Sequence, residues 1–157
     1  MRKLPQITIE RAHIEDLPDL LAVADSYFEQ GSYDAHGYDR DVMQKTMSVF
    51  LMDDEQAGFK AKHGDKIVGY YGVCFVKTFT VRPIMYEVHF AVMPEYAKTS
   101  AGRDLTKAVI EYGKKISAVA FYAGVTSGIK RFDQTMQNMY HKQGLQSCGV
   151  MMRYLYE

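Results

Sequence analysis

The chain has 157 residues, of which 47% are hydrophobic, and it carries 19 basic and 19 acidic side chains. This length and apolar content predict one domain, residues 1–157, large enough to bury a substantial core. The balanced charge provides no net field for nucleic acid or an anionic membrane, so we expect neither partner. No apolar run approaches the ~18 residues of a membrane span and the N-terminus lacks a signal-peptide core, which favours a cytoplasmic protein.

The chain contains two cysteines, Cys74 and Cys148, too few to cross-link a domain of this size. They form no Cys-x-x-Cys pair, and the histidines show no His-x-x-x-His spacing. We therefore expect two reduced, mostly buried thiols and no metal centre.

The N-terminal third of the sequence predicts a strand followed by two helices. Residues 7–9 alternate as in a strand, and apolar residues then recur at helical spacing from about Pro18 to Gly31, where glycine is a common helix end. The aromatic and acidic segment 32–39 has no periodicity and is expected to be a loop. A second helical stripe covers residues 42–50.

Strand patterns dominate the middle of the chain. Segments 59–63, 67–79 and 84–92 are rich in β-branched and aromatic residues, and a Gly64-Asp65 turn separates the first two. They predict an antiparallel meander.

The last third of the sequence alternates between helix and strand patterns. A helix is expected at residues 101–116, a buried strand at 119–125, a helix at 132–144, and a closing strand region at 145–156.

The segment Phe-Ala-Val-Met-Pro-Glu-Tyr-Ala-Lys-Thr-Ser-Ala-Gly-Arg-Asp-Leu, residues 90–105, leads from a strand through a small-residue loop into a helix. Backbone N–H groups at a helix N-terminus lack intrahelical partners and lie at the positive end of the helix dipole, so they stabilise anionic oxygens. Small residues such as Ala101 and Gly102 let a ligand approach the backbone closely. The segment therefore predicts a phosphate-binding site.

The order of elements and this loop resemble the GNAT superfamily of N-acetyltransferases over nearly the whole chain. The resemblance implies an α/β (α+β) fold with a mixed, mostly antiparallel sheet of six to seven strands flanked by about four helices. It also implies acetyl-coenzyme A (acetyl-CoA) as co-substrate, with its pyrophosphate on the loop. The cofactor-binding residues that it implies are Phe90, Ala91, Val92, Ala97, Lys98, Thr99, Ser100, Ala101, Gly102, Arg103 and Asp133.

The loop departs from the family pattern at Ala97, where arginine or glutamine is preferred, and at Ser100, where glycine is preferred. A serine held in the left-handed conformation costs roughly 1 to 2 kcal/mol. Because about 1.4 kcal/mol is tenfold in affinity, this predicts roughly tenfold weaker cofactor binding. The departures leave open an alternative: a non-catalytic GNAT-like binding or assembly module that has weakened or lost CoA binding.

The resemblance implies direct transfer of the acetyl group to a primary amine of a small molecule or a protein. Tyr140 matches the family tyrosine that protonates the leaving thiolate, and an ordinary tyrosine pKa of about 10 keeps that proton available. Its alternative role is to continue the apolar stripe of the last helix. Strict alternation places Glu87 and His89 on one face of strand 84–92, about 7 Å apart. Either could accept the amine proton, and the resemblance favours Glu87.

The resemblance also places the segment 27–39 beside the acceptor. Its aromatic and acidic side chains suit a cationic amine, although an ordinary solvated loop is the commoner explanation for them. The candidate substrate-binding residues are Phe28, Tyr33, Asp34 and Tyr38. The partners implied are acetyl-CoA and an amine acceptor, with a homodimer left open.

Overall fold

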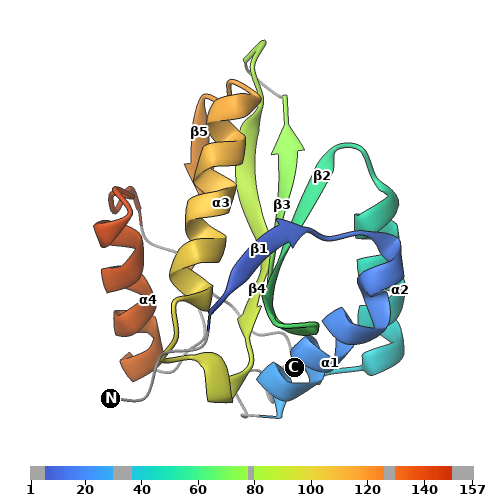
Figure 1. The fold of residues 1–157 in the computed structure, drawn as a ribbon. Coiled ribbons are helices and arrows are strands. Elements are labelled where there is room, and N and C mark those ends of the chain that lie inside the picture. Colours follow the sequence, from blue (N-terminus) through green and yellow to red (C-terminus); the bar gives the residue numbers. More distant parts are fainter. Residues whose placement is uncertain (1–5, 30–36, 78–79, 126–129, 150–157) are drawn as a thin grey trace.

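A five-stranded sheet forms the centre of the computed structural model, which describes residues 6–29, 37–77, 80–125 and 130–149. Its strands lie in chain order: β1 (Thr8–Arg11), β2 (Gln56–His63), β3 (Lys66–Val76), β4 (Ile84–Val92) and β5 (Ala120–Tyr122). Neighbouring strands are antiparallel except β4 and β5, which are parallel. Figure 1 shows this twisted sheet with helices on both sides.

Four helices cover the two faces of the sheet. Their bounds are α1 (Leu17–Phe28), α2 (Arg40–Met52), α3 (Ala101–Lys115) and α4 (Lys130–Lys142), and short 3₁₀ turns η1 (Ile14–Asp16) and η3 (Pro94–Tyr96) precede α1 and α3. Tyr70 belongs to the buried cluster beneath α1 and α2, whereas the next residue, Tyr71, belongs to the cluster beneath α3 and α4. Because successive strand residues point to opposite faces, the two helix pairs lie on opposite sides of the sheet (Figure 1).

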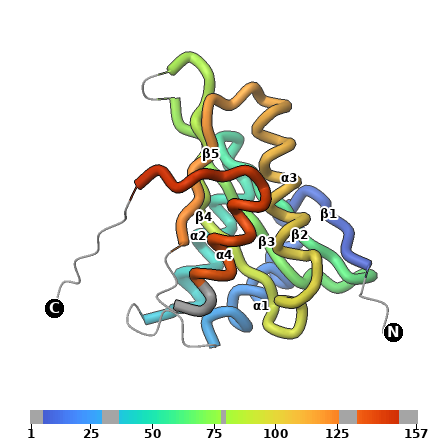
Figure 2. The backbone as a smooth tube through the Cα atoms, turned by 90° about the vertical axis from the view of Figure 1, so that its left-hand side faces the viewer, coloured from blue at the N-terminus to red at the C-terminus, as the bar shows by residue number. Residues whose placement is uncertain are grey.

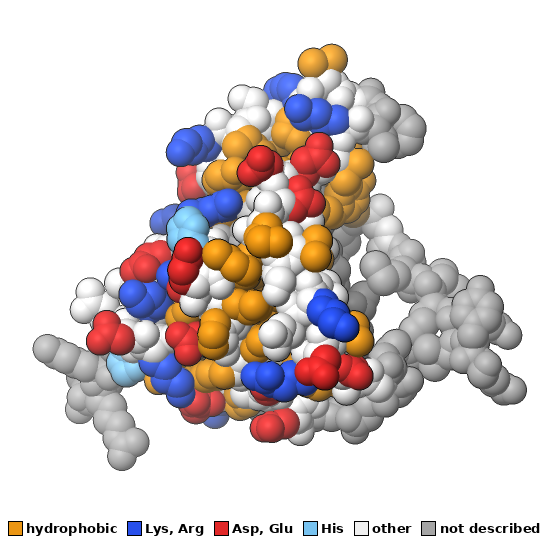
Figure 3. Space-filling model, turned by 90° about the vertical axis from the view of Figure 1, so that its right-hand side faces the viewer, with side chains coloured by type: hydrophobic (Ala, Val, Ile, Leu, Met, Phe, Trp, Pro, Cys, Tyr) orange, Lys and Arg blue, Asp and Glu red, His pale blue; other side chains and the backbone are white. Residues whose placement is uncertain are grey.

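Local signals explain where α2 begins and which side it buries. The Asp39 carboxylate accepts hydrogen bonds from the N–H groups of Asp41 and Val42 and so caps the helix. Met47 and Phe50 are buried against the sheet. The outer side exposes Val42, Val49 and Met52, and Figure 3 shows apolar side chains interspersed with charged ones on this face of the molecule.

A β-bulge in β4 changes the alternation of its side chains. On β3, Gly72 pairs with His89 and Val73 pairs with Glu87, so Val88 has no partner. An extra residue shifts everything beyond it to the other face of the strand. Glu87 and Phe90 therefore share one face, and His89 and Ala91 share the other.

The sequence patterns predicted most elements correctly, including β4 and α3. The Gly64 turn is present, with φ at +61°. Two strand predictions are wrong in extent. The strand expected at 119–125 forms only at Ala120–Tyr122, and residues 145–149 form no strand, while 150–157 lie outside the described residues. The described sheet thus has five strands rather than six or seven.

Cys74 is half-buried and Cys148 is exposed, which corrects the expectation of two mostly buried thiols. Over the described parts of the chain, none of the helices has both the length and the apolarity needed to cross a membrane. The same residues contain no cluster of three metal-ligating side chains.

Candidate active site

A cleft of about 1890 Å³ opens where β4 and β5 separate. The two strands pair over only three residues each, Ile84–Tyr86 with Ala120–Tyr122. Beyond this pairing the cleft is lined by Glu87–Ala91, by residues 123–125, by α4 and by the chain that follows α4. Figure 2 shows that following segment crossing over β4 and β5. The other end of the cleft reaches α1 and α2, where Leu20, Val23, Phe28 and Met43 line it.

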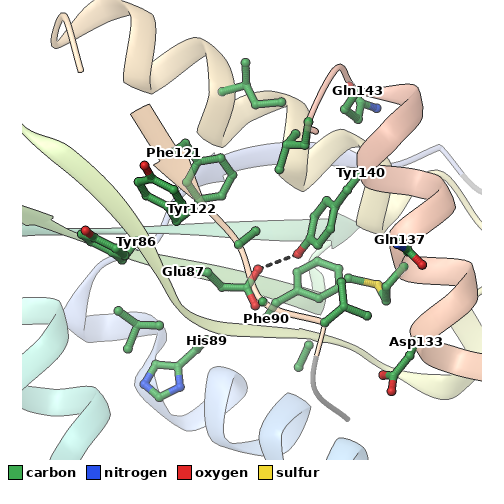
Figure 4. Close-up of a pocket in the computed structure, with 18 of the residues that line it drawn as sticks. Tyr86, Glu87, His89, Phe90, Phe121, Tyr122, Asp133, Gln137, Tyr140 and Gln143 are labelled. Atoms are coloured by element: carbon green, nitrogen blue, oxygen red, sulfur yellow. Dashed lines mark hydrogen bonds between the residues drawn. The ribbon is translucent and has the colours of Figure 1, made fainter. Parts of the chain in front are cut away.

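Three hydroxyl and carboxyl groups meet at the cleft wall between β4 and α4. The hydroxyls of Tyr71 and Tyr140 each lie 2.5 Å from the same oxygen, Oε2 of Glu87, and 3.0 Å from each other. The backbone N–H of Gly124 also donates to the Glu87 carboxylate. Figure 4 shows Glu87 and Tyr140 pointing toward each other from β4 and α4.

Burial and hydrogen bonding act in opposite directions on Glu87. Burial raises the pKa of this carboxyl above its usual range, while the hydrogen bonds from Tyr140, Tyr71 and Gly124 stabilise the anion and limit the rise. Burial, together with the neighbouring Glu87 carboxylate, raises the pKa values of Tyr71 and Tyr140. Both tyrosines therefore hold their protons at neutral pH, and Glu87 titrates closer to neutrality than an exposed glutamate.

His89 lies on the opposite face of β4, so the prediction that it shares a face with Glu87 is wrong because of the bulge at Val88. Its ring is 5.8 Å from Phe50 and 6.4 Å from Tyr70, between centroids. Burial lowers its pKa, and its Nε2 is buried with no hydrogen-bond partner among the described residues. Figure 4 shows the imidazole pointing away from the Glu87–Tyr140 pair.

The loop before α3 is not strained. Ser100 has φ −77° and ψ −5°, a right-handed conformation, so the cost predicted for a left-handed serine does not arise. The N–H groups of Ala97 and Thr99 donate to the carbonyls of Pro94 and Tyr96, which closes two tight turns. The expectation of weaker cofactor binding through strain at Ser100 is therefore wrong.

The N-terminus of α3 has the donors that the sequence predicted. The N–H of Ala101 donates to Thr99 Oγ1, and the first intrahelical bond runs from Asp104 N–H to the Ser100 carbonyl, at 2.8 Å. The N–H groups of Gly102 and Arg103 consequently have no intrahelical acceptor. The side chains of Lys98 and Arg103 are exposed beside them.

Gly102 is needed for packing rather than for an unusual backbone angle. A Cβ atom there would lie 3.3 Å from Phe90 Cζ and 3.6 Å from the sulfur of Met139. Phe90 lines the cleft, whereas residues 97–103 do not, so the loop adjoins the cleft at Phe90. Ala91 lines the cleft as well, and Val92 packs against the core beneath α3.

The remaining predicted residues lie at both ends of the cleft. Asp133 lines it from α4 and Phe28 from α1. Tyr38 stacks on Phe28 with ring centroids 4.2 Å apart, and its hydroxyl donates to Asp25, which also pairs with Arg40 at 2.9 Å. Two further predicted residues, Tyr33 and Asp34, lie outside the described residues.

Sequence reasoning missed Tyr71 as a member of the site. Tyr71 is fully buried and packs with Phe90, 4.8 Å between centroids. The pattern of strand 67–79 marks it only as a core aromatic. A strand residue that meets a helix 69 positions later leaves no local signal in the sequence.

A mostly antiparallel sheet whose fourth and fifth strands run parallel and then part over a cleft defines the GNAT class of acetyltransferase folds. The chain belongs to the acetyltransferase (GNAT) family, whose model matches residues 17–145. We found no match to the chain among curated proteins.

Solved structures share this fold. The aminoglycoside acetyltransferase meta-AAC0020 from an uncultured soil metagenomic sample, in complex with trehalose, is 19% identical with a TM-score of 0.72, covering 96% of this chain and 97% of that one. AAC(6')-Iy with the bisubstrate analogue CoA-S-monomethyl-acetylneamine is 13% identical with a TM-score of 0.75, covering 97% and 99%. A possible acetyltransferase from Clostridium difficile 630 is 18% identical with a TM-score of 0.74, covering 99% and 98%. Because all three identities are below 20%, these similarities show a shared fold and do not show a shared substrate.

Proposed function

We propose that this protein is an N-acetyltransferase that moves an acetyl group from acetyl-CoA to a primary amine by direct attack. The observation that carries the proposal is the buried pair of Glu87 and Tyr140 on the wall of the cleft, joined by a hydrogen bond of 2.5 Å. A carboxylate with a raised pKa and a protonated phenol are the two groups that amine acetylation needs, one as base and one as acid. Family membership supports the same reaction class.

The loop before α3 fits the phosphates of acetyl-CoA. The N–H groups of Gly102 and Arg103 have no intrahelical acceptor, and Lys98 adds positive charge beside them. The exposed Arg103 guanidinium pairs with Asp104 at 3.0 Å and would exchange this contact for one to a phosphate oxygen. The relaxed backbone at Ser100 removes the expected cost of holding the loop. From this end the pantetheine arm would follow Phe90–Val92 along β4, with Asp133 on the facing helix.

The reaction balances with the groups present. The amine nitrogen forms a C–N bond to the acetyl carbon while the C–S bond breaks. Glu87 accepts the proton that the amine loses, and Tyr140 gives its hydroxyl proton to the departing sulfur. Backbone N–H groups of β4 near Ala91–Val92 would hold the acetyl oxygen. No covalent intermediate with the protein is required.

The acceptor would enter from the end of the cleft beside α1 and α2. Solved neighbours include aminoglycoside acetyltransferases, which supports an amine as acceptor. The stacked rings of Phe28 and Tyr38 lie at this end and would contact the body of the acceptor. Because Asp25 already pairs with Arg40 and Tyr38, it is a weaker attractor for a cation than an unpaired carboxylate.

The second candidate is a GNAT-like module that binds a partner and does not catalyse. Ala97 favours it, because this loop position has no side-chain donor for a phosphate oxygen. Ser100 no longer favours it, because its backbone is unstrained.

Calorimetric titration with acetyl-CoA, compared with desulfo-CoA, separates the two candidates. We expect binding at about micromolar concentration, equivalent to about 8 kcal/mol, followed by CoA release when an amine panel is added. The absence of binding at millimolar acetyl-CoA would contradict the enzyme and favour the module. Binding without transfer to any amine would contradict the catalytic role alone.

A further inference from the structure

Tyr71 is a buried hydroxyl that the reaction described above does not use. It is 0% exposed, it does not line the cleft, and it touches both groups that the proposed reaction does use. Its oxygen lies 2.5 Å from Glu87 Oε2 and 3.0 Å from Tyr140 Oη. A hydroxyl this close to two reacting groups can affect both without contacting substrate.

The three oxygens form a closed triangle that can hold either two or three protons. With Glu87 ionised, the two phenolic hydrogens occupy the two 2.5 Å edges, and the 3.0 Å edge between the tyrosines carries none. With Glu87 protonated on Oε2, a third hydrogen allows one hydrogen bond on each edge. Each phenol has one donor hydrogen and can also accept, so both arrangements satisfy every oxygen.

We propose that Tyr71 is a positioning residue for acetyl transfer, because its hydroxyl donates to whichever of Glu87 and Tyr140 carries the negative charge. The inference rests on the proposed function. Tyr71 holds Glu87 as a carboxylate before the reaction and supports Tyr140 as a phenolate after the thiolate has been protonated.

The triangle also provides a proton path that resets the site. Tyr140 gives its proton to the sulfur and becomes a phenolate, and Glu87 has meanwhile accepted one proton from the amine. That proton moves along the 2.5 Å edge from Glu87 to Tyr140, which restores the carboxylate and the phenol. One proton has then travelled from nitrogen to sulfur, and the protein has gained and lost none. Tyr71 needs only to rotate its hydrogen from Oε2 to Tyr140 Oη and back.

Each element packed against Glu87 places an identified group beside its carboxylate. Tyr71 on β3, Tyr140 on α4 and the Gly124 N–H after β5 donate to the carboxylate. His89 follows on β4 but lies on the other face. Asp133 on α4 lines the same cleft. The donors to the carboxylate are therefore neutral, and removing one should change its titration directly.

The test replaces Tyr71 with phenylalanine and uses Tyr70→Phe as the matched control. Tyr70 is the chain neighbour, is 2% exposed, and has a hydroxyl with no partner in the described structure. Carbon-13 NMR of glutamate carboxyls, assigned with Glu87→Gln, gives the Glu87 pKa without turnover. The kinetic readouts are kcat, the KM for acetyl-CoA, and the pH dependence of kcat.

Tyr71→Phe should raise the Glu87 pKa by about one unit and shift the acidic limb of kcat upward by the same amount, because one donor to the anion is lost. We expect kcat to fall about tenfold to a hundredfold, since a hydrogen bond to a charged group is lost, with the KM for acetyl-CoA unchanged. Tyr70→Phe should leave the Glu87 pKa and the pH dependence of kcat at their wild-type values, because Tyr70 lines the α1–α2 end of the cleft on the face of β3 opposite to Tyr71.

Several results would overturn the inference. An unchanged Glu87 pKa in Tyr71→Phe would do so, and a fall in kcat without a shift of the pH profile would mark a purely structural role. An equal change in the Glu87 pKa and in the pH profile of kcat in Tyr70→Phe would also overturn the inference. If the wild-type protein transfers no acetyl group, the proposed function fails and the proton path with it. The carbon-13 titration separates this case, because it reports whether Tyr71 holds Glu87.

Discussion

Glu87 and His89 lie two positions apart on β4, both largely buried, yet their surroundings differ completely. The Glu87 carboxylate receives hydrogen bonds from Tyr71, Tyr140 and Gly124. The His89 ring packs against Phe50 and Tyr70, and its Nε2 has no partner in the described structure. Burial alone shifts both pKa values toward the neutral form, so a shifted pKa does not by itself identify a catalytic group.

The bulge at Val88 creates this difference. It turns Glu87 toward α4, and it turns His89 toward Phe50 and Tyr70 beneath α1 and α2, where His89 lines that end of the cleft. A proton can leave Glu87 through its hydrogen-bonded neighbours. We therefore assign proton transfer to Glu87 and its hydrogen-bonded neighbours, and substitutions on the two faces of β4 test this assignment.

The largest expected effect follows from removing the acid on the Glu87 side. Tyr140→Phe should lower kcat by about 10² to 10⁴, the usual contribution of a general acid, with little change in the KM for acetyl-CoA. Release of free CoA with an accepted amine measures the rate, and circular dichroism checks the fold. Turnover equal to that of the wild-type protein would remove Tyr140 from the mechanism.

A medium effect is expected at the phosphate end of the cleft. Arg103→Glu should weaken acetyl-CoA binding about tenfold, because a charge-assisted contact is replaced by repulsion at the helix N-terminus. Lys107→Glu makes the same charge change one turn further along α3 and should alter the dissociation constant by less than about threefold at physiological salt. Calorimetry on both variants measures the difference. Equal losses would show that the ligand does not sit at the start of α3.

The smallest effect concerns stability on the His89 side. Burial lowers the folded-state pKa of His89, so the unfolded chain binds its proton more readily and the protein loses stability as pH falls below about 6.5. His89→Leu should raise the free energy of unfolding by about 1 kcal/mol at pH 7, because it removes a buried ring nitrogen, Nε2, that has no hydrogen-bond partner among the described residues. It should also flatten the loss of stability below pH 6.5.

Urea unfolding of the wild-type protein and His89→Leu at several pH values measures both quantities. A destabilised His89→Leu variant with an unchanged pH dependence would mean that the imidazole has a polar partner after all.

The sequence predicted β4 and the start of α3 because their signals are local. Alternation over 84–92 and a small-residue loop before a helix can be recognised in a short window. The bulge could not be predicted, because it depends on how β4 registers against Gly72 and Val73 of another strand. That one shift reversed the predicted face of His89.

Two further features were not predicted, one set by local turns and one by tertiary structure. Ser100 departs from the family pattern, yet the turns set by the carbonyls of Pro94 and Tyr96 leave it in a right-handed conformation. Tyr71 joins the site only because α4 brings Tyr140 within 3.0 Å of it. Spacing along the sequence does not reveal the contact between Tyr71 and Tyr140, which are 69 positions apart.

The assignment of Glu87 as the base can be tested by comparing Glu87→Gln with His89→Gln in one acetyl-transfer assay with the same amine. Both changes keep the size and polarity of the side chain nearly constant while removing a titratable group. We predict that Glu87→Gln lowers kcat by about a hundredfold or more, as expected for a general base, and that His89→Gln stays within about threefold of the wild-type value. A loss confined to His89→Gln would place the base on the other face of β4 and contradict the role of Glu87.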